Sequence, residues 1–111
     1  MGPDELEAAV DRAALAAILE ARGRNREALE TLRAALTTLE AVLGADHYEV
    51  GLTLRNLGAM HMSAGRYAEA DATLTRAAVI LERVLGPSHP VAVACRARRG
   101  HARSLRNGRG G

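Results

Sequence analysis

"GRNREALETLRAALTTLEAVLGADH" at residues 23–47 and "GRYAEADATLTRAAVILERVLGPSH" at residues 65–89 are two copies of one sequence pattern. Aligned with a shift of 42 residues and no gap, the two segments are identical at 13 of 25 positions. An internal repeat of this period indicates that one supersecondary unit is stacked on a copy of itself. The fold follows from this repeat.

Each copy carries apolar residues at the spacing of an amphipathic helix. The stripe residues are Ala28, Leu32, Ala35, Leu39 and Val42 in the first copy and Ala70, Leu74, Ala77, Leu81 and Val84 in the second. Glycines interrupt the pattern between helices at Gly23 and Gly65, and Gly44 and Gly86 stand where a left-handed glycine can end a helix. We therefore expect five helices, over residues 5–22, 25–43, 47–64, 67–85 and 89–105.

The recurring Leu-Gly-x-x-His phrase marks helix starts. Asp4, Asp46 and Ser88 occupy equivalent positions in front of three of these starts, and their side-chain oxygens suit the exposed amides of a helix N-terminus. We predict that these three residues are N-caps. Asp4 with Glu7, and Asp46 with Glu49, resemble capping boxes.

Composition indicates one small helical domain. The chain has 111 residues, 48% of them apolar, without Phe or Trp, so Ala and Leu must form the core, which favours close-packed helices over a β-sandwich. All 15 basic residues are Arg, a bias typical of GC-rich bacterial genomes. The single Cys95 fits a reducing compartment, and no apolar run approaches a signal peptide or a membrane helix. We expect a cytoplasmic protein.

The basic charge belongs to the C-terminal segment. Residues 1–87 hold nine Arg and all 13 acids, whereas residues 88–111 hold six Arg and no acid. The last helix carries Arg96, Arg99 and Arg103 at the positions where the preceding repeat has apolar residues or His61. Since a following helix would bury these charges at high cost, we expect this face to meet water. Cys95, Ala102 and Leu105 would then pack backward, as in a capping helix.

Residues 54–94, "LRNLGAMHMSAGRYAEADATLTRAAVILERVLGPSHPVAVA", resemble the tetratricopeptide repeat in the 42-residue form of kinesin light chains. The first repeat departs from the family at Ala14, where Asn is preferred, and at Asn25, where Tyr is preferred. The matching residues are Leu54, Asn56, Leu57, Gly65, Arg66, Tyr67, Glu69, Ala70, Leu74, Arg76, Ala77, Ile80, Glu82, Leu85, Gly86, Pro87, His89 and Pro90.

The resemblance implies an all-α fold, a short right-handed α-solenoid of antiparallel helix pairs with about two and a half repeats. Repeat 1 would span residues 4–45, repeat 2 residues 46–87, and the capping helix residues 88–106, which together form a domain over 1–106, followed by a flexible tail at 107–111. His61 occupies a family Tyr position, where we expect a half-buried packing residue.

The resemblance also implies a function, that of a non-catalytic module that binds a peptide or a partner helix on the concave face of the first helices. The family's contact positions correspond to Leu52, Arg55, Asn56, Ala59, Met62, Arg98 and His101. The first repeat offers Val10, Ala13, Ala14, Ala17 and Glu20. Because Arg55 and Arg98 can form charge-assisted bonds to carboxylates, an acidic partner is favoured.

Two alternatives remain open. The apolar flank formed by Leu6, Val10, Ala14 and Ala17 could support end-to-end stacking into a homo-oligomer, or the chain could be a fragment of a longer repeat array in a larger bacterial regulator. The segment "RARRGHARSLRNGRGG" at residues 96–111 could bind nucleic acid, although it lacks aromatic residues for base stacking.

We expect neither catalysis nor a cofactor, because no nucleophile–base motif or phosphate-binding glycine loop is present. His47 and His89 lack partners at zinc-ligand spacing, so we interpret them as markers of helix starts.

Overall fold

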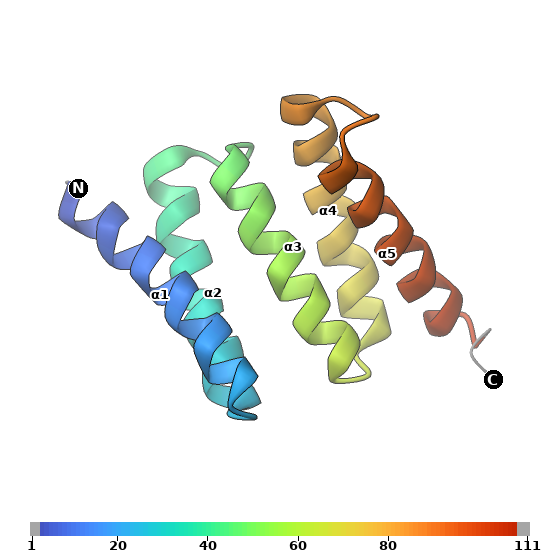
Figure 1. Cartoon of the computed structure of the whole chain (residues 1–111), viewed down its shortest axis with the longest axis horizontal. Coiled ribbons are helices and arrows are strands. Elements are labelled where there is room, and N and C mark those ends of the chain that lie inside the picture. Colours follow the sequence, from blue (N-terminus) through green and yellow to red (C-terminus); the bar gives the residue numbers. More distant parts are fainter. Residues whose placement is uncertain (1–2, 109–111) are drawn as a thin grey trace.

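The computed structural model describes residues 3–108, and these form five α-helices and no strand (Figure 1). The predicted helices agree with the observed ones to within two residues at every end, so the prediction from the repeat period is confirmed. The last part of the predicted tail, residues 109–111, lies outside the described residues. The helices are α1 (Pro3–Ala21), α2 (Asn25–Leu43), α3 (Tyr48–Ser63), α4 (Tyr67–Leu85) and α5 (Pro90–Arg106).

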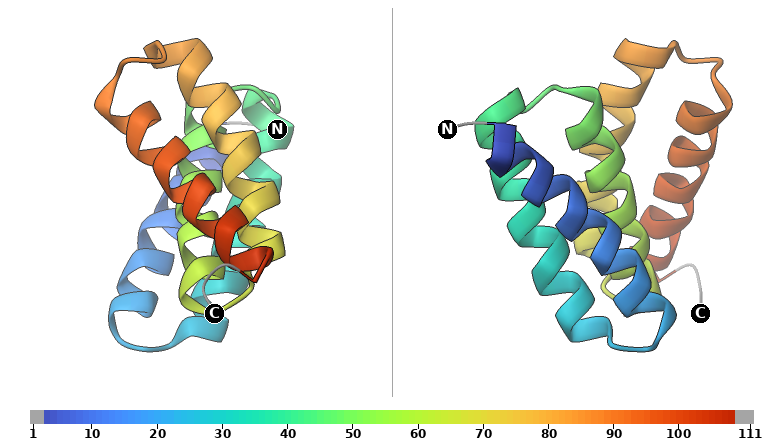
Figure 2. Two further views of the ribbon diagram at one scale, coloured as in Figure 1. Left: turned by 90° about the vertical axis from the view of Figure 1, so that its right-hand side faces the viewer. Right: turned by 60° about the vertical axis from the view of Figure 1, so that its left-hand side comes forward.

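The molecule measures 46 × 33 × 19 Å, and the helices follow one another in chain order along its longest axis. α1 packs against α2 and α3 against α4, as two antiparallel pairs, while α2–α3 and α4–α5 contacts join the units. α1 therefore lies at one end and α5 at the other (Figures 1 and 2). This is the predicted all-α solenoid with a single final helix. None of the helices within residues 3–108 combines the length and apolar character needed to cross a membrane.

The predicted apolar stripes form the core, with an exception at their C-terminal ends. Eight stripe residues are at most 1% exposed: Ala28, Leu32, Ala35, Leu39, Ala70, Leu74, Ala77 and Leu81. The expectation was wrong for Val84, which is 49% exposed, and Val42 is only partly buried. Val84 lies in the last turn of α4, next to the Gly86 junction.

α3 and α4 approach each other closely because α3 has glycine at two contact positions. A Cβ atom on Gly58 would lie 2.5 Å from Cγ and Cδ2 of Leu74, and one on Gly51 would lie 2.8 Å from Cγ2 of Ile80. Both distances are far below van der Waals contact. The small residues thus let leucine and isoleucine of α4 fill the space that a side chain on α3 would occupy.

The two Leu-Gly-x-x-His junctions have the same geometry. Gly44 and Gly86 have φ of 94° and 95°, a region that favours glycine, and their N–H groups donate to Glu40 O and Glu82 O. Each glycine ends one helix, and the next helix begins four residues later. The phrase therefore marks the boundary between repeat units, as predicted.

The capping residues differ from the prediction. His47 and His89 are the N-caps of α3 and α5, and their Nδ1 atoms accept hydrogen bonds from the N–H groups of Glu49 (3.0 Å) and Val91 (3.1 Å). Asp46 and Ser88 lie one residue further out and are exposed. Extended backbone at each histidine (φ −72° and −64°) directs the imidazole over the first turn.

The predicted capping boxes were wrong for the same reason. Asp46 does not cap α3, and its carboxylate instead lies 3.6 Å from Nη1 of Arg83 in an exposed ion pair. α1 already begins at Pro3, so Asp4 lies inside the first helical turn. Near the positive end of the helix dipole its charge is still favourable.

Removing a histidine cap should destabilise the domain. His47→Ala and His89→Ala leave the N–H of Glu49 or Val91 without its partner, and we expect each to lower the free energy of unfolding by about 0.5–2 kcal/mol. Asn should restore most of the loss, because its Oδ1 can accept the same bond. Urea denaturation followed by circular dichroism measures this, and equal losses for Ala and Asn would contradict the capping role.

Two glycines at equivalent repeat positions should respond in opposite ways to alanine. Gly58→Ala inserts a methyl group into Leu74, so it should destabilise by about 1–3 kcal/mol despite the better helix propensity. Apart from its chain neighbours and the backbone of its own helix, a Cβ atom on Gly100 would have no heavy atom within 4 Å, so Gly100→Ala should stabilise α5 by about 0.8–1 kcal/mol. Thermal denaturation of the two variants in dilute solution compares them directly.

Candidate functional site

Two adjoining hollows lie between α3 and α5. Ala94 and Arg98 line both, so the hollows are continuous. The first, of about 370 Å³, is lined by Arg55, Asn56, Pro90, Val91, Ala94, Cys95 and Arg98. The second, of about 500 Å³, is lined by Ala59, Met62, Ser63, Ala94, Ala97, Arg98 and His101.

A third hollow, of about 150 Å³, lies on the other side of α3, toward α1. Its lining residues are Ala13, Ala17, Glu20, Leu32, Asn56, Ala59 and Met60. Asn56 and Ala59 therefore border hollows on both sides of α3. The three hollows form one concave surface across α1, α3 and α5, here called the groove.

The structure brings six of the seven predicted contact residues together in the groove. Leu52 differs, because it is partly buried against the core and lines none of the three hollows. In α1, Ala13, Ala17 and Glu20 line the third hollow, whereas Val10 is exposed outside it. The six residues are Arg55, Asn56, Ala59, Met62, Arg98 and His101.

The chemistry of the groove changes from one side of α3 to the other. Toward α1 the lining is mostly apolar, from alanine, leucine and methionine, with Glu20 as its acid. Toward α5 it contains Arg55 and Arg98. Nη2 of Arg55 donates to Oδ1 of Asn56 at 3.3 Å, which leaves the amide NH₂ of Asn56 free to donate to a ligand.

Cys95 lies at the bottom of the α3–α5 hollow and is buried. Burial raises the pKa of its thiol, and this effect outweighs the opposing charges of Arg55, Arg98 and Arg99. The Sγ atom lies 3.7 Å from Leu74 O, to which it donates. A protonated, buried thiol is a packing group and not a nucleophile at neutral pH.

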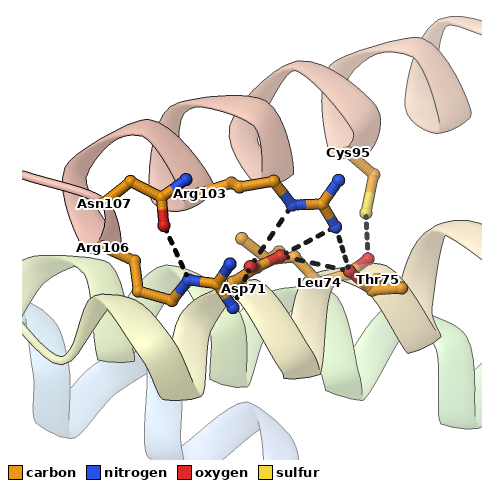
Figure 3. Close-up of polar contacts among 7 residues, drawn as sticks. All are labelled: Asp71, Leu74, Thr75, Cys95, Arg103, Arg106 and Asn107. Carbon is orange, nitrogen blue, oxygen red and sulfur yellow. Dashed lines mark hydrogen bonds and ion pairs between the residues drawn. The ribbon is translucent and has the colours of Figure 1, made fainter. Parts of the chain in front are cut away.

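The position of α5, and with it the second wall of the groove, depends on a buried carboxylate in α4. Asp71 is 3% exposed. Nε and Nη2 of Arg103 donate to its two oxygens at 3.3 and 3.2 Å, and Nη1 of Arg106 lies 2.9 Å from Oδ2 (Figure 3). The hydroxyl of Thr75 donates to Oδ1 at 3.3 Å. Two arginines one helical turn apart on α5 thus clamp one acid on α4.

These contacts correct the prediction that the arginine face of α5 simply meets water. Arg103 binds Asp71, and Nη1 of Arg96 lies 3.2 Å from Oε2 of Glu82. Arg99 is partly buried, and among the described residues its Nε has no hydrogen-bond partner. Cys95 and Ala102 pack backward on α4 as predicted, whereas Leu105, the third residue of that prediction, is only partly buried and does not join the core. The acids of α4 therefore compensate charge that was expected to be solvated.

The pKa of Asp71 reflects a balance between burial and the arginines. Burial raises the pKa of this carboxyl, but the hydrogen bond from Arg103 and the charges of Arg103 and Arg106, together with the Thr75 hydroxyl, outweigh it and leave the pKa below its usual value. The carboxylate is ionised at neutral pH. The sequence pattern did not reveal this group, because an isolated acid in a helix is usually solvated.

A separate pocket of about 190 Å³ lies near the α1–α2 and α3–α4 turns, lined in part by Asn25, Arg26, His61 and Arg66. His61 is 3% exposed and not half-buried as expected. Burial lowers the pKa of its imidazole, with Glu69 acting in the opposite direction and Arg33 and Arg66 in the same one. His61 is therefore neutral at pH 7.

Within residues 3–108 no group of three or more His, Cys, Asp or Glu side chains gathers as metal ligands would.

Stacked antiparallel helix pairs with a lined concave surface define a helical-repeat protein of the α-solenoid class. A family model described as Tetratricopeptide repeat matches residues 6–77 and, in a second overlapping match, residues 49–109. The chain belongs to the tetratricopeptide repeat family, whose repeats mediate protein–protein interaction. The 42-residue form of the repeat is consistent with this match. A search of curated proteins returned no match.

The Asp71 cluster should make the stability of the domain depend on pH in the acid range. Folding lowers the pKa of Asp71, so its ionised carboxylate stabilises the folded domain. This stabilisation is fully present at pH values above the pKa of Asp in the unfolded chain, about 3.9. It disappears as the pH falls through the pKa of Asp71 in the folded domain. Asp71→Asn should lower the free energy of unfolding at pH 7 by about 1.5–3 kcal/mol. The difference from the wild type should shrink in acid.

Urea denaturation between neutral and acidic pH measures this effect. Asp46→Asn is the matched control, because Asp46 forms an exposed ion pair with Arg83 and its loss should change stability by less than about 0.5 kcal/mol. A difference between Asp71→Asn and wild type that is independent of pH would rule out the buried carboxylate as its cause.

Proposed function

We propose that this domain is a non-catalytic module that binds an acidic peptide segment of another protein in the groove. The observation that carries the proposal is the convergence of Arg55, Asn56 and Arg98 on one hollow between α3 and α5. Guanidinium groups suit bidentate bonds to carboxylates. The amide of Asn56 suits a backbone carbonyl of the ligand.

The apolar part of the groove supports the same function. Ala59 and Met62 on α3, with Ala94 and Ala97 on α5, border space that apolar side chains of a peptide can fill. Methionine adapts readily to ligands of different shape. A peptide with one or two carboxylates next to apolar residues therefore matches the groove best.

Charge also gives the groove a direction. Glu20 lies at the α1 side and Arg98 at the α5 side. A bound peptide should place its acidic residues beside α5 and keep them away from Glu20.

The buried, unpaired Cys95 agrees with a reducing compartment, and we assign the module to the cytoplasm.

Peptide selection from a random display library tests the proposal. The wild-type domain should enrich acidic peptides that the Arg55→Ala/Arg98→Ala double variant does not enrich. For a selected peptide, each single variant should lower affinity about tenfold, which corresponds to about 1.4 kcal/mol. Fluorescence anisotropy with the labelled peptide, and with a version carrying Asn and Gln in place of Asp and Glu, measures this loss.

Arg83→Ala is the matched control, because Arg83 is exposed on α4 outside the groove and its replacement should leave affinity unchanged. Circular dichroism confirms that every variant is folded. Equal enrichment of the same peptides on the wild type and the double variant would place binding elsewhere and refute the groove as the site.

A further inference from the structure

α5 keeps a helix-packing position that no helix in the described chain occupies. Gly100 lies one 42-residue period after Gly58. On α3, Leu74 of α4 fills the space over Gly58, whereas no atom of another helix lies within 4 Å of a Cβ added to Gly100. We call the outward stripe around it the α5 end face. It consists of Val93, Ala97, Gly100 and Ser104, at helical spacing.

α1 has an outward face without a neighbour at the opposite end of the molecule. Leu15 and Ile18 are 46% and 51% exposed, among the most exposed large apolar residues of the described chain. The predicted flank of Leu6, Val10, Ala14 and Ala17 does not form this face as a unit, since Leu6 packs on the core and Ala17 lines the groove. The α1 end face consists of Asp4, Glu7, Asp11, Ala14, Leu15 and Ile18, all exposed.

The α1 end face and the helix that carries the α5 end face differ in charge. The α1 end face carries three carboxylates and no arginine. The four residues of the α5 end face are uncharged, but Arg96, Arg99 and Arg103 stand next to them in the sequence of α5. α5 carries five arginines and no acid, and Asp71 and Glu82 of α4 compensate only part of that charge. Figure 2 shows α5 in front when one end of the molecule faces the viewer and α1 in front from the other side. The surfaces therefore cannot meet within one chain.

We propose that the α1 end face of one copy packs antiparallel on the α5 end face of a second copy. Leu15 and Ile18 would cover Gly100 and Ala97, in the way that Leu74 covers Gly58 within the chain. With Leu15 over Gly100, the helical rise of about 1.5 Å per residue places Asp11 level with residue 104, next to Arg103. The same antiparallel alignment of α1 and α5 therefore allows both the apolar contact of Leu15 with Gly100 and the attraction between Asp11 and Arg103.

Charge selects this head-to-tail arrangement over symmetric ones. A pair of α1 end faces would bring six carboxylates together, and a pair of α5 helices would oppose arginines. The head-to-tail contact joins two different surfaces and leaves one of each free. It is therefore heterologous, and growth into short chains is expected as concentration rises. The α5 end face shares Ala97 with the groove, but Arg55 and Arg98, which carry the proposed peptide binding, belong to neither end face, so the two proposals are tested by different variants.

Complementary variants test the proposal by sedimentation velocity. Wild-type protein should show a mass that rises with concentration and falls with added salt. Ile18→Arg blocks the α1 end face and Gly100→Arg blocks the α5 end face, so each alone should remain monomeric. In an equimolar mixture, the intact α1 end face of Gly100→Arg can pack on the intact α5 end face of Ile18→Arg. The two variants should therefore form a dimer, which cannot grow further because both of its remaining end faces are blocked.

Both substitutions are at exposed positions, so circular dichroism should show folded monomers. Val79→Arg is the matched control, because Val79 is 49% exposed but lies on α4, and it should assemble like the wild type. A wild type that is monomeric at every concentration overturns the proposal. So does a Gly100→Arg variant that still dimerises, which would reveal an α1–α1 contact, or a mixture of blocked variants that stays monomeric.

Discussion

Close approach of antiparallel helices through small residues is the constraint on which the rest of this structure depends. The chain has neither Phe nor Trp, so its core consists mainly of leucine side chains set against alanine and glycine. At Gly58 the fit with Leu74 leaves no room for a methyl group. Because a small residue and a leucine occupy the equivalent buried positions in both helix pairs, as Ala16 and Leu32 in the first and Gly58 and Leu74 in the second, the spacing within the pairs recurs as well. That regular spacing lines up α1, α3 and α5 along one concave surface.

The fold could be predicted from the sequence because its determinants are local and repeated. Helix bounds follow from the apolar stripes and from glycines such as Gly44 and Gly86, which lie within a few residues of the structure they control. The identity of the caps did not follow. Asp is preferred over His at N-cap positions, which favoured Asp46. The Nδ1 atom of His, however, is as many bonds from Cα as the side-chain oxygen of Asp or Asn, so His47 can accept the same kind of capping hydrogen bond. The imidazole therefore reaches the same amide from one residue nearer the helix.

The groove was predictable in part, for a similar reason. Six of the predicted contact residues line the groove, because their places in the repeat put them on the surface that faces it. Leu52 is partly buried because the side of α3 that it occupies also contacts the core. Asp71 could not be predicted, since its burial depends on Arg103 and Arg106 more than thirty residues away. Only the packing of α5 on α4 brings the three charges together.

The way α5 is attached explains how one helix can close a solenoid and still offer a surface for contact. Its inward side uses Cys95 and Ala102, and its edge uses Arg103 against Asp71. These contacts fix α5 without the outward residues Val93 and Gly100. In α3 both sides are occupied, since α4 covers Gly58. A terminal helix held by small residues on one side and ion pairs at its edge therefore stays anchored whether or not another helix covers its outward face.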